Sequence, residues 1–262
     1  MHKNTTQELA GIAVRKIEYL KQNPLGFFIS TMMAGAYVGV GVFLILTLGN
    51  DADPASRNLI MGCFFGIALC LVIFAGAELF SGHIMYMTFG FLYKKIGVLT
   101  VIKDWIICWY GNLFGAVLLS VLFALGGGGG WMDDSSSLVH QLADAKMNSG
   151  VVELLARAAI CNWLLCLAIW MTSKTESDTT KCILIFWCLF AFVAAGFEHS
   201  IANMSIFTVS LLGDHPDTVS LYGLLYNLAW VSMGNIIGGA GFIGIAYYLT
   251  GHPLGKHQES DC

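Results

Sequence analysis

The chain of 262 residues is 56% hydrophobic and only 11% charged, with a formal net charge of -4 and a mean hydropathy of +0.71. Soluble domains carry about 25% charged residues, so most of this surface cannot face water, and the composition predicts a membrane protein. There is no basic tract of the kind that binds nucleic acid. Seven of the eight cysteines lie in apolar runs without a C-x-x-C pair, which favours a role as small hydrophobic residues.

The first 24 residues are polar and charged, and the apolar run that follows them is too long for the hydrophobic region of a signal peptide. No cleaved signal is therefore expected. Thr5 and Glu8 have the spacing of a capping box, and apolar residues recur at helical period from Leu9 to Leu20. Residues 1–24 are predicted to form an amphipathic helix on the cytoplasmic membrane surface, with the stem of Lys16 snorkelling.

Long apolar runs follow, and a helix needs about 20 apolar residues to cross a bilayer. The uncharged runs that satisfy this length are Leu25–Leu48, Asn58–Ala77, Ile106–Leu125 and Tyr222–Thr250, and Ala158–Ser173 reaches it with the turn before it. The segments around Ala77 and Phe197 differ, because each apolar run meets a glutamate and continues after a glycine or polar patch. The prediction is an all-α polytopic protein with six spans in residues 25–251, interrupted second and fifth helices, and a cytoplasmic tail at 252–262.

The distribution of lysine and arginine predicts the orientation of these spans. If both termini are cytoplasmic, ten of the 13 basic residues lie on the cytoplasmic side, and only Arg57, Lys146 and Arg157 lie outside. The expected topology therefore has the N and C termini inside.

Two short motifs recur in the two halves of the chain, about 25–125 and 150–250. "GAELFS" (residues 76–81) resembles "GFEHSI" (196–201) at an offset of 120 residues, and "GNLFG" (111–115) resembles "GNIIG" (234–238) at 123. Three spans in each half give the halves opposite topology, so the pattern predicts an inverted repeat of 3+3 spans, as in transporters and channels. Non-helical backbone at membrane depth is tolerated where it lines a pathway, so both interruptions are expected to face a pore.

Ionisable groups inside the membrane are expensive, and Glu78, Glu198 and His199 are the ones near the interruptions. Because a glutamate occurs in both halves, Glu78 and Glu198 are predicted to be structural carboxylates that accept hydrogen bonds from amides of the broken helices. His199 has no counterpart in the first half and is the candidate for a functional role. No H-E-x-x-H motif or i, i+4 histidine pair is present, and His83 lies in the opposite half, so no metal site is expected.

The motifs "NPLGF", "MAGAYVGVGV", "ICNWLLCLAIWM" and "GFEHSIANM" resemble those of the formate/nitrite transporter family of bacterial anion channels, over nearly the whole chain. Within the family, "ELFSGHIMYMTFG" and "EHSIANM" are most similar to the nitrite channels of enterobacteria. The resemblance implies an aquaporin-like protomer in the inner membrane, a homopentamer, no cofactor and no enzymatic activity. It implies pore residues at His199, Asn162, Ser81 and Lys146, and apolar constrictions at Phe65, Leu69, Leu79, Phe80, Leu165 and Phe192.

These implied positions suggest a mechanism for nitrite. Large apolar side chains penalise an anion, and a weak acid avoids that penalty if it crosses as the neutral species. His199 could supply or share the proton, with Asn162 fixing its ring. Open alternatives are a channel for formate, hydrosulfide or other small monovalent weak-acid anions, a membrane enzyme or redox subunit, and a solute pump.

Overall fold

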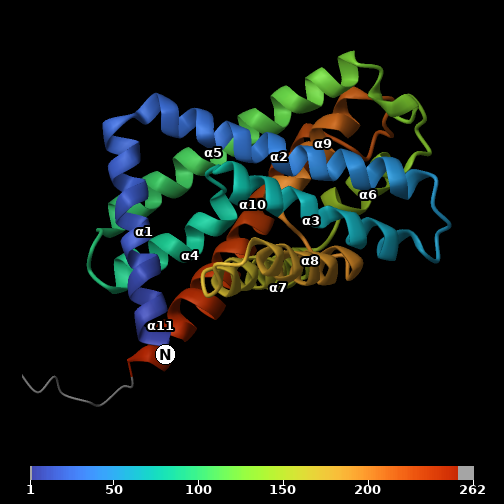
Figure 1. Ribbon diagram of the computed structural model, residues 1–262. Coiled ribbons are helices and arrows are strands. Elements are labelled where there is room, and N and C mark those ends of the chain that lie inside the picture. Colours follow the sequence, from blue (N-terminus) through green and yellow to red (C-terminus); the bar gives the residue numbers. More distant parts are fainter. Residues whose placement is uncertain (1, 253–262) are drawn as a thin grey trace, which may run out of the picture.

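The computed structural model describes residues 2–252, and all regular structure within that range is helical (Figure 1). The elements in chain order are α1 (His2–Gln22), α2 (Pro24–Asn50), α3 (Arg57–Ala75), α4 (Phe80–Leu92), α5 (Val98–Leu125), the short 3₁₀ turn η1 (Gly128–Gly130), α6 (Leu138–Met147), α7 (Val151–Thr172), α8 (Asp178–Ala194), α9 (Ser200–Leu212), α10 (Leu221–Ile236), the π-helical segment η2 (Ile237–Ile245) and α11 (Ala246–Gly251). The predicted cytoplasmic tail lies outside the described residues except for its first residue, His252.

Within residues 2–252, five helical stretches are long and apolar enough to cross a membrane, namely α2, α3, α5, α7 and the continuous run from α10 to α11. They correspond to the five long apolar runs of the sequence. The helix α5 begins at Val98, eight residues before the predicted start at Ile106, and so includes the charged residues Lys103 and Asp104. The helices α8 and α9 are each shorter than 18 residues and are separated by a break.

The packing repeats in the two halves. The helix α2 packs on α3 and α5, and α7 packs on α8 and α10, while contacts between α3 and α8 join the halves. The half-helices that follow the breaks cross over: α4 packs on η2 of the second half, and α9 packs on α5 of the first half. Both breaks therefore lie at the interface between the halves.

Close approach of the helices depends on glycine. A methyl group at Gly115 of α5 would overlap the carbonyl of Met32 in α2, and one at Gly238 would overlap the carbonyl of Ala159 in α7. Small residues let helix backbones meet at this distance, which van der Waals packing in a membrane favours.

The helices α1 and α6 lie at opposite ends of the bundle, and α1 runs across its end beside α11 (Figure 1). The apolar face of α1, including Leu9, Ala13 and Ile17, is buried in the protein, mainly against α4. The expectation for Lys16 is wrong: its ammonium does not snorkel to a membrane surface but forms an ion pair with Glu78.

Candidate functional site

The helical path is interrupted by non-helical residues, called breaks below, between α3 and α4 and between α8 and α9. Each break begins at a glycine in the left-handed region, Gly76 with φ 75° and Gly196 with φ 71°. Only glycine enters this region without strain from a Cβ atom. The helices resume at Phe80 and Ser200, and their first backbone amides have no partner within their own helix.

Two asparagines bind these amides. Asn112 of α5 accepts from the amide of Phe80 at 2.9 Å and donates to the carbonyls of Thr31 and Glu78 at 2.7 and 3.0 Å. Its side chain is completely buried. The bonds to the amide of Phe80 and the carbonyl of Glu78 satisfy backbone groups of the break that the membrane interior would otherwise leave unpaired, and the bond to Thr31 ties the asparagine to α2.

The second asparagine makes the same set of contacts at the other break. Asn235 accepts from the amide of Ser200 at 3.0 Å and donates to the carbonyls of Ala158 and Glu198 at 2.9 and 3.1 Å. The expectation that the glutamate carboxylates hold the broken backbone is therefore wrong. The asparagine amide does so because it offers both an acceptor and donors, whereas an ionised carboxylate only accepts.

The carboxylate of Glu198 is instead part of a polar network at the α6 end of the break. It accepts from Lys146 of α6 at 2.8 Å and from Asn203 at 2.6 Å. Asn203 also donates to Asn227 at 2.9 Å, and Asn227 donates to the carbonyl of Lys146 at 2.8 Å. Lys146 and Glu198 are the two charged members of this network, and Glu198 is 1% exposed.

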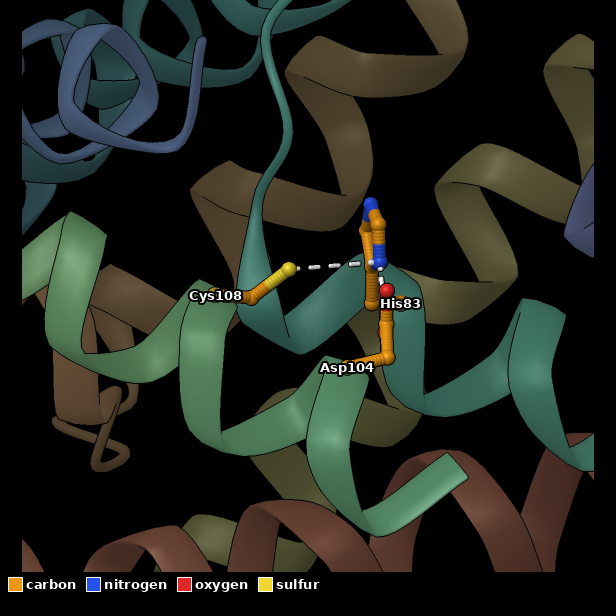
Figure 2. Close-up of side chains that lie close together, drawn as sticks. All are labelled: His83, Asp104 and Cys108. Atoms are coloured by element: carbon orange, nitrogen blue, oxygen red, sulfur yellow. Dashed lines mark hydrogen bonds and ion pairs between the residues drawn. The ribbon is translucent and has the colours of Figure 1, made fainter. Parts of the chain in front are cut away.

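The carboxylate of Glu78 belongs to a second network at the α1 end. Its Oε2 atom binds Lys16 of α1 and lies 2.6 Å from Nε2 of His83. Nδ1 of His83 lies 2.8 Å from Oδ2 of Asp104, and Cys108 Sγ lies 3.4 Å from the same nitrogen. Figure 2 shows His83 on α4 pointing toward Asp104 and Cys108 on α5.

His83, Asp104 and Cys108 also form a group of potential metal ligands, with atoms within 4.8 Å of one another. Hydrogen bonding accounts for this approach, because both ring nitrogens of His83 already face carboxylate oxygens. A metal ion at Nδ1 would have to displace the contact with Asp104. The geometry therefore favours a hydrogen-bonded network over a metal centre.

His199 stands at the second break, as the residue before α9. Its Nδ1 accepts from the amide of Ala202 at 3.3 Å, and its Nε2 lies 3.1 Å from Oγ of Ser81. A ring that accepts at Nδ1 is neutral and carries its proton on Nε2, so His199 donates to Ser81. This contact joins the two breaks.

Asn162 is close to these residues but does not bind the ring of His199. Its side chain donates to the carbonyls of Ser81 and Asn235 at 3.3 and 2.7 Å. The expectation that Asn162 fixes the His199 tautomer is wrong; the backbone amide of Ala202 does so.

Two cavities lie on either side of the breaks. The α1-side cavity, about 230 Å³, is lined by residues that include Lys16, Glu78, His83, Leu69 and Leu79. The α6-side cavity, about 100 Å³, is lined by residues that include Lys146, His199, Asn203, Phe65 and Phe192.

Apolar side chains line much of both cavities. The rings of Phe65 and Phe192 pack edge to face at 5.6 Å, and both are 2% exposed. Phe80 and Leu165, also expected at constrictions, are buried but line neither of these two cavities.

Five functional candidates were missed by reasoning from the sequence. They are Asn112, Asn235, Asp104, Asn203 and Asn227. The first two lie inside the repeated "GN" motifs, so the repeat could have identified them. Asn203 lies inside the motif "GFEHSIANM", five residues after Glu198, so the motif could have identified it. Asp104 and Asn227 had no comparable signal, because their partners His83 and Asn203 are 21 and 24 residues away.

Known proteins share this arrangement of helices. The sequence profile described as formate/nitrite transporter matches residues 3–249. The chain is 47% identical to the nitrite transporter NirC of Escherichia coli over 95% of this chain and 92% of that protein. It is 31% identical to the formate channel BtFdhC of Bacillus thuringiensis, over 88% and 89% of the two chains.

Solved structures agree with the sequence relatives. A structure described as an FNT family ion channel superposes with a TM-score of 0.92 at 45% identity, over 94% of this chain and 98% of that chain. A pentameric formate channel with formate bound gives a TM-score of 0.73 at 25% identity, over 88% and 98%. With its apolar membrane-spanning helices, the chain belongs to the formate/nitrite transporter family of membrane proteins.

Proposed function

We propose that this protein is a nitrite channel of a bacterial inner membrane and works as a homopentamer with one pore in each protomer. The substrate is supported by the 47% identity to the E. coli nitrite transporter. The oligomer is supported by the similarity to a pentameric formate channel. Formate is the main alternative substrate, because formate channels are also among the relatives.

The proposed protomer has six spans in an aquaporin-like inverted repeat, with α3–α4 and α8–α9 as the two interrupted spans. The equivalent contacts of Asn112 and Asn235 at the two breaks support this symmetry. So do the ion pairs of Glu78 and Glu198, which link the breaks to α1 and α6 at opposite ends of the bundle. The excess of basic residues near α1 supports the assignment of that end, and of both termini, to the cytoplasm.

The observation that carries the transport mechanism is the position of His199 and Ser81 beside an apolar constriction between two cavities. The ammonium of Lys146 attracts an anion into the α6-side cavity, although Glu198 partly balances its charge. Phe65 and Phe192 then impose a desolvation penalty that falls on the anion far more than on a neutral acid. Nitrite therefore crosses as nitrous acid.

His199 and Ser81 serve that crossing as hydrogen-bond donors. Nε2 of His199 donates to the hydroxyl of Ser81, which leaves the hydroxyl proton free for an acceptor in the pore. The pair thus presents a hydrogen-bond donor at the point where the anion loses its water. The proton that converts nitrite to nitrous acid comes from the water of the cavity, and the neutral His199–Ser81 pair keeps its own protons.

Nitrite flux into vesicles containing the purified protein, measured at several pH values, tests this function. His199→Phe removes the donor and is expected to lower flux at least about tenfold, the effect of about 1.4 kcal/mol. His199→Asn keeps hydrogen-bonding atoms but cannot titrate between pH 5 and 8, and is expected to keep flux with an altered pH profile. Wild-type flux and pH dependence in both variants would refute the role of His199.

Competition between nitrite and formate in the same vesicles tests the substrate. Nitrite is expected to cross faster than formate at equal concentration and pH. A preference for formate would instead identify formate as the substrate.

A further inference from the structure

The two networks at the breaks have equivalent glutamate–lysine ion pairs but differ in one pair of neighbouring residues. In each, a glutamate after the left-handed glycine binds a lysine from a helix at the end of the bundle, Glu78 with Lys16 and Glu198 with Lys146. Each glutamate also binds a side chain five residues later, on the helix that follows the break. That side chain is where the networks diverge.

The divergent pair is amide in one network and ionisable in the other. Asn203 follows His83 by the same 120 residues that separate the two glutamates, and Asn227 follows Asp104 by the 123 residues that relate the "GN" motifs. Asn203 binds its glutamate at 2.6 Å and Asn227 at 2.9 Å. His83 binds its glutamate at 2.6 Å and Asp104 at 2.8 Å. An imidazole and a carboxylate therefore replace two amides in the same geometry.

The contacts of His83 determine its protonation. Both ring nitrogens lie against carboxylate oxygens, and a ring nitrogen must carry a proton to donate to an ionised carboxylate, so ionised Glu78 and Asp104 together require an imidazolium. His199 is the opposite case, because its Nδ1 accepts from a backbone amide. The pathway thus contains one neutral and one charged histidine.

The charge of the α1-side network depends on that proton. With an imidazolium, the charges of Lys16, Glu78, His83 and Asp104 sum to zero; with a neutral ring, they sum to one negative charge. The α6-side network has only Lys146 and Glu198 as charged groups and is neutral throughout. The other titratable groups near His83 are Tyr86 on its own helix, Cys108 on α5 and Cys166 on α7.

We propose that His83 and Asp104 form a second titratable pair of the permeation pathway, and that the His83 imidazolium keeps the α1-side cavity neutral for a monovalent weak-acid anion. His83 and Glu78 line this cavity, so loss of the proton places an unbalanced negative charge in its wall. A neutral ring keeps one N–H, so it can donate to Glu78 or to Asp104 but not to both, and the Oδ1 atom of Asp104 already has no partner. Rising pH on the α1 side therefore lowers anion flux, and rising pH on the α6 side does not act through this pair. The inference rests on the proposed function for the identity of the anion.

The double variant H83N/D104N tests the proposal, because it copies the Asn203–Asn227 pair into the α1-side network. Initial nitrite flux is measured from the α6 side to the α1 side in vesicles of known orientation, while the α1-side pH is varied. The α6-side pH is held constant, so the fraction of nitrous acid at the entrance does not change. Wild-type flux is expected to fall about tenfold when the α1-side pH rises far enough to remove the proton, as an unbalanced charge repels the anion. The double variant is expected to lose this dependence. His83→Asn alone is expected to reduce flux at every pH, because Asp104 stays charged, and the second substitution is expected to rescue it.

The exposed Lys103→Gln, next to Asp104 on α5, is the control, and it is expected to keep the wild-type dependence. The proposal is overturned if the double variant keeps the dependence on α1-side pH. It is also overturned if ¹⁵N NMR of labelled histidine, assigned by loss of a signal in His83→Asn, finds a neutral His83 at pH 7. The NMR measurement needs no substrate. If the wild type carries no nitrite, the proposed function fails, and NMR alone then decides the protonation of His83.

Discussion

Asn235 offers a direct test of what holds the broken helices. Asn235→Ala removes three hydrogen bonds, to the amide of Ser200 and the carbonyls of Ala158 and Glu198, from a position that is completely buried. Hydrogen bonds between membrane helices contribute on average about 0.6 and at most about 1.7 kcal/mol each, so the three together contribute about 2 to 5 kcal/mol. In a protein of this size, each 1 kcal/mol shifts the midpoint of thermal unfolding by about 2–4 °C.

The matched control is Asn23→Ala. Asn23 is exposed and its side chain accepts one hydrogen bond, from the amide of Gly26 at the start of α2. Loss of such a cap costs about 1 kcal/mol. Thermal unfolding of the detergent-purified variants, followed by circular dichroism, is expected to show a midpoint at least about 4 °C lower for Asn235→Ala and a decrease of about 2–4 °C or less for Asn23→Ala. Equal shifts in the two variants would show that the asparagine does not hold the break.

Two further substitutions test the ion pair and the glycine at the second break. Lys146→Met leaves Glu198 buried without its cation and is expected to destabilise the protein by about 3–5 kcal/mol. The control Arg157→Met removes an exposed ion pair with Glu153 and is expected to cost less than about 1 kcal/mol. Thermal unfolding compares the two variants, and similar shifts of the midpoint would contradict the importance of burial. Gly196→Ala is expected to destabilise the protein by about 1–2 kcal/mol, because φ at this position is 71°. The control Gly150→Ala, where φ is -70° and the added methyl also meets open space, is expected to change the stability by only about a few tenths of a kcal/mol. A larger loss of stability at Gly150 would disprove the role of the left-handed conformation.

The membrane-spanning helices could be predicted from the sequence because they depend on a property of single segments, the length of an apolar run. The predicted first residue of a helix is wrong where charged residues precede its apolar run. The helix α5 begins at Val98, eight residues before Ile106, and includes Asp104, which is buried and paired with His83 of another helix. A criterion that stops at charged residues cannot anticipate a partner 21 residues away.

The candidate site could be predicted only in part, and for a similar reason. The repeated glycines located both breaks, and the family resemblance identified His199 and Ser81, which the structure brings within 3.1 Å. The partners of the glutamates could not be deduced, because Lys146 reaches Glu198 from the helix α6, a short element with no long apolar run. The roles of Asn162 and the capping asparagines depend on backbone groups, which a sequence pattern does not place in space.

The crossing of the half-helices has a consequence for the order of synthesis. Asn112, which binds the first amide of α4, follows the end of that helix by about 20 residues, but the packing partner η2 begins about 145 residues after the end of α4. At about 5–20 residues per second, α4 waits on the order of 10–30 s for that surface. The contacts of α4 with η2 therefore form only after most of the second half of the chain has been synthesised, later than its contacts with α1 and α5.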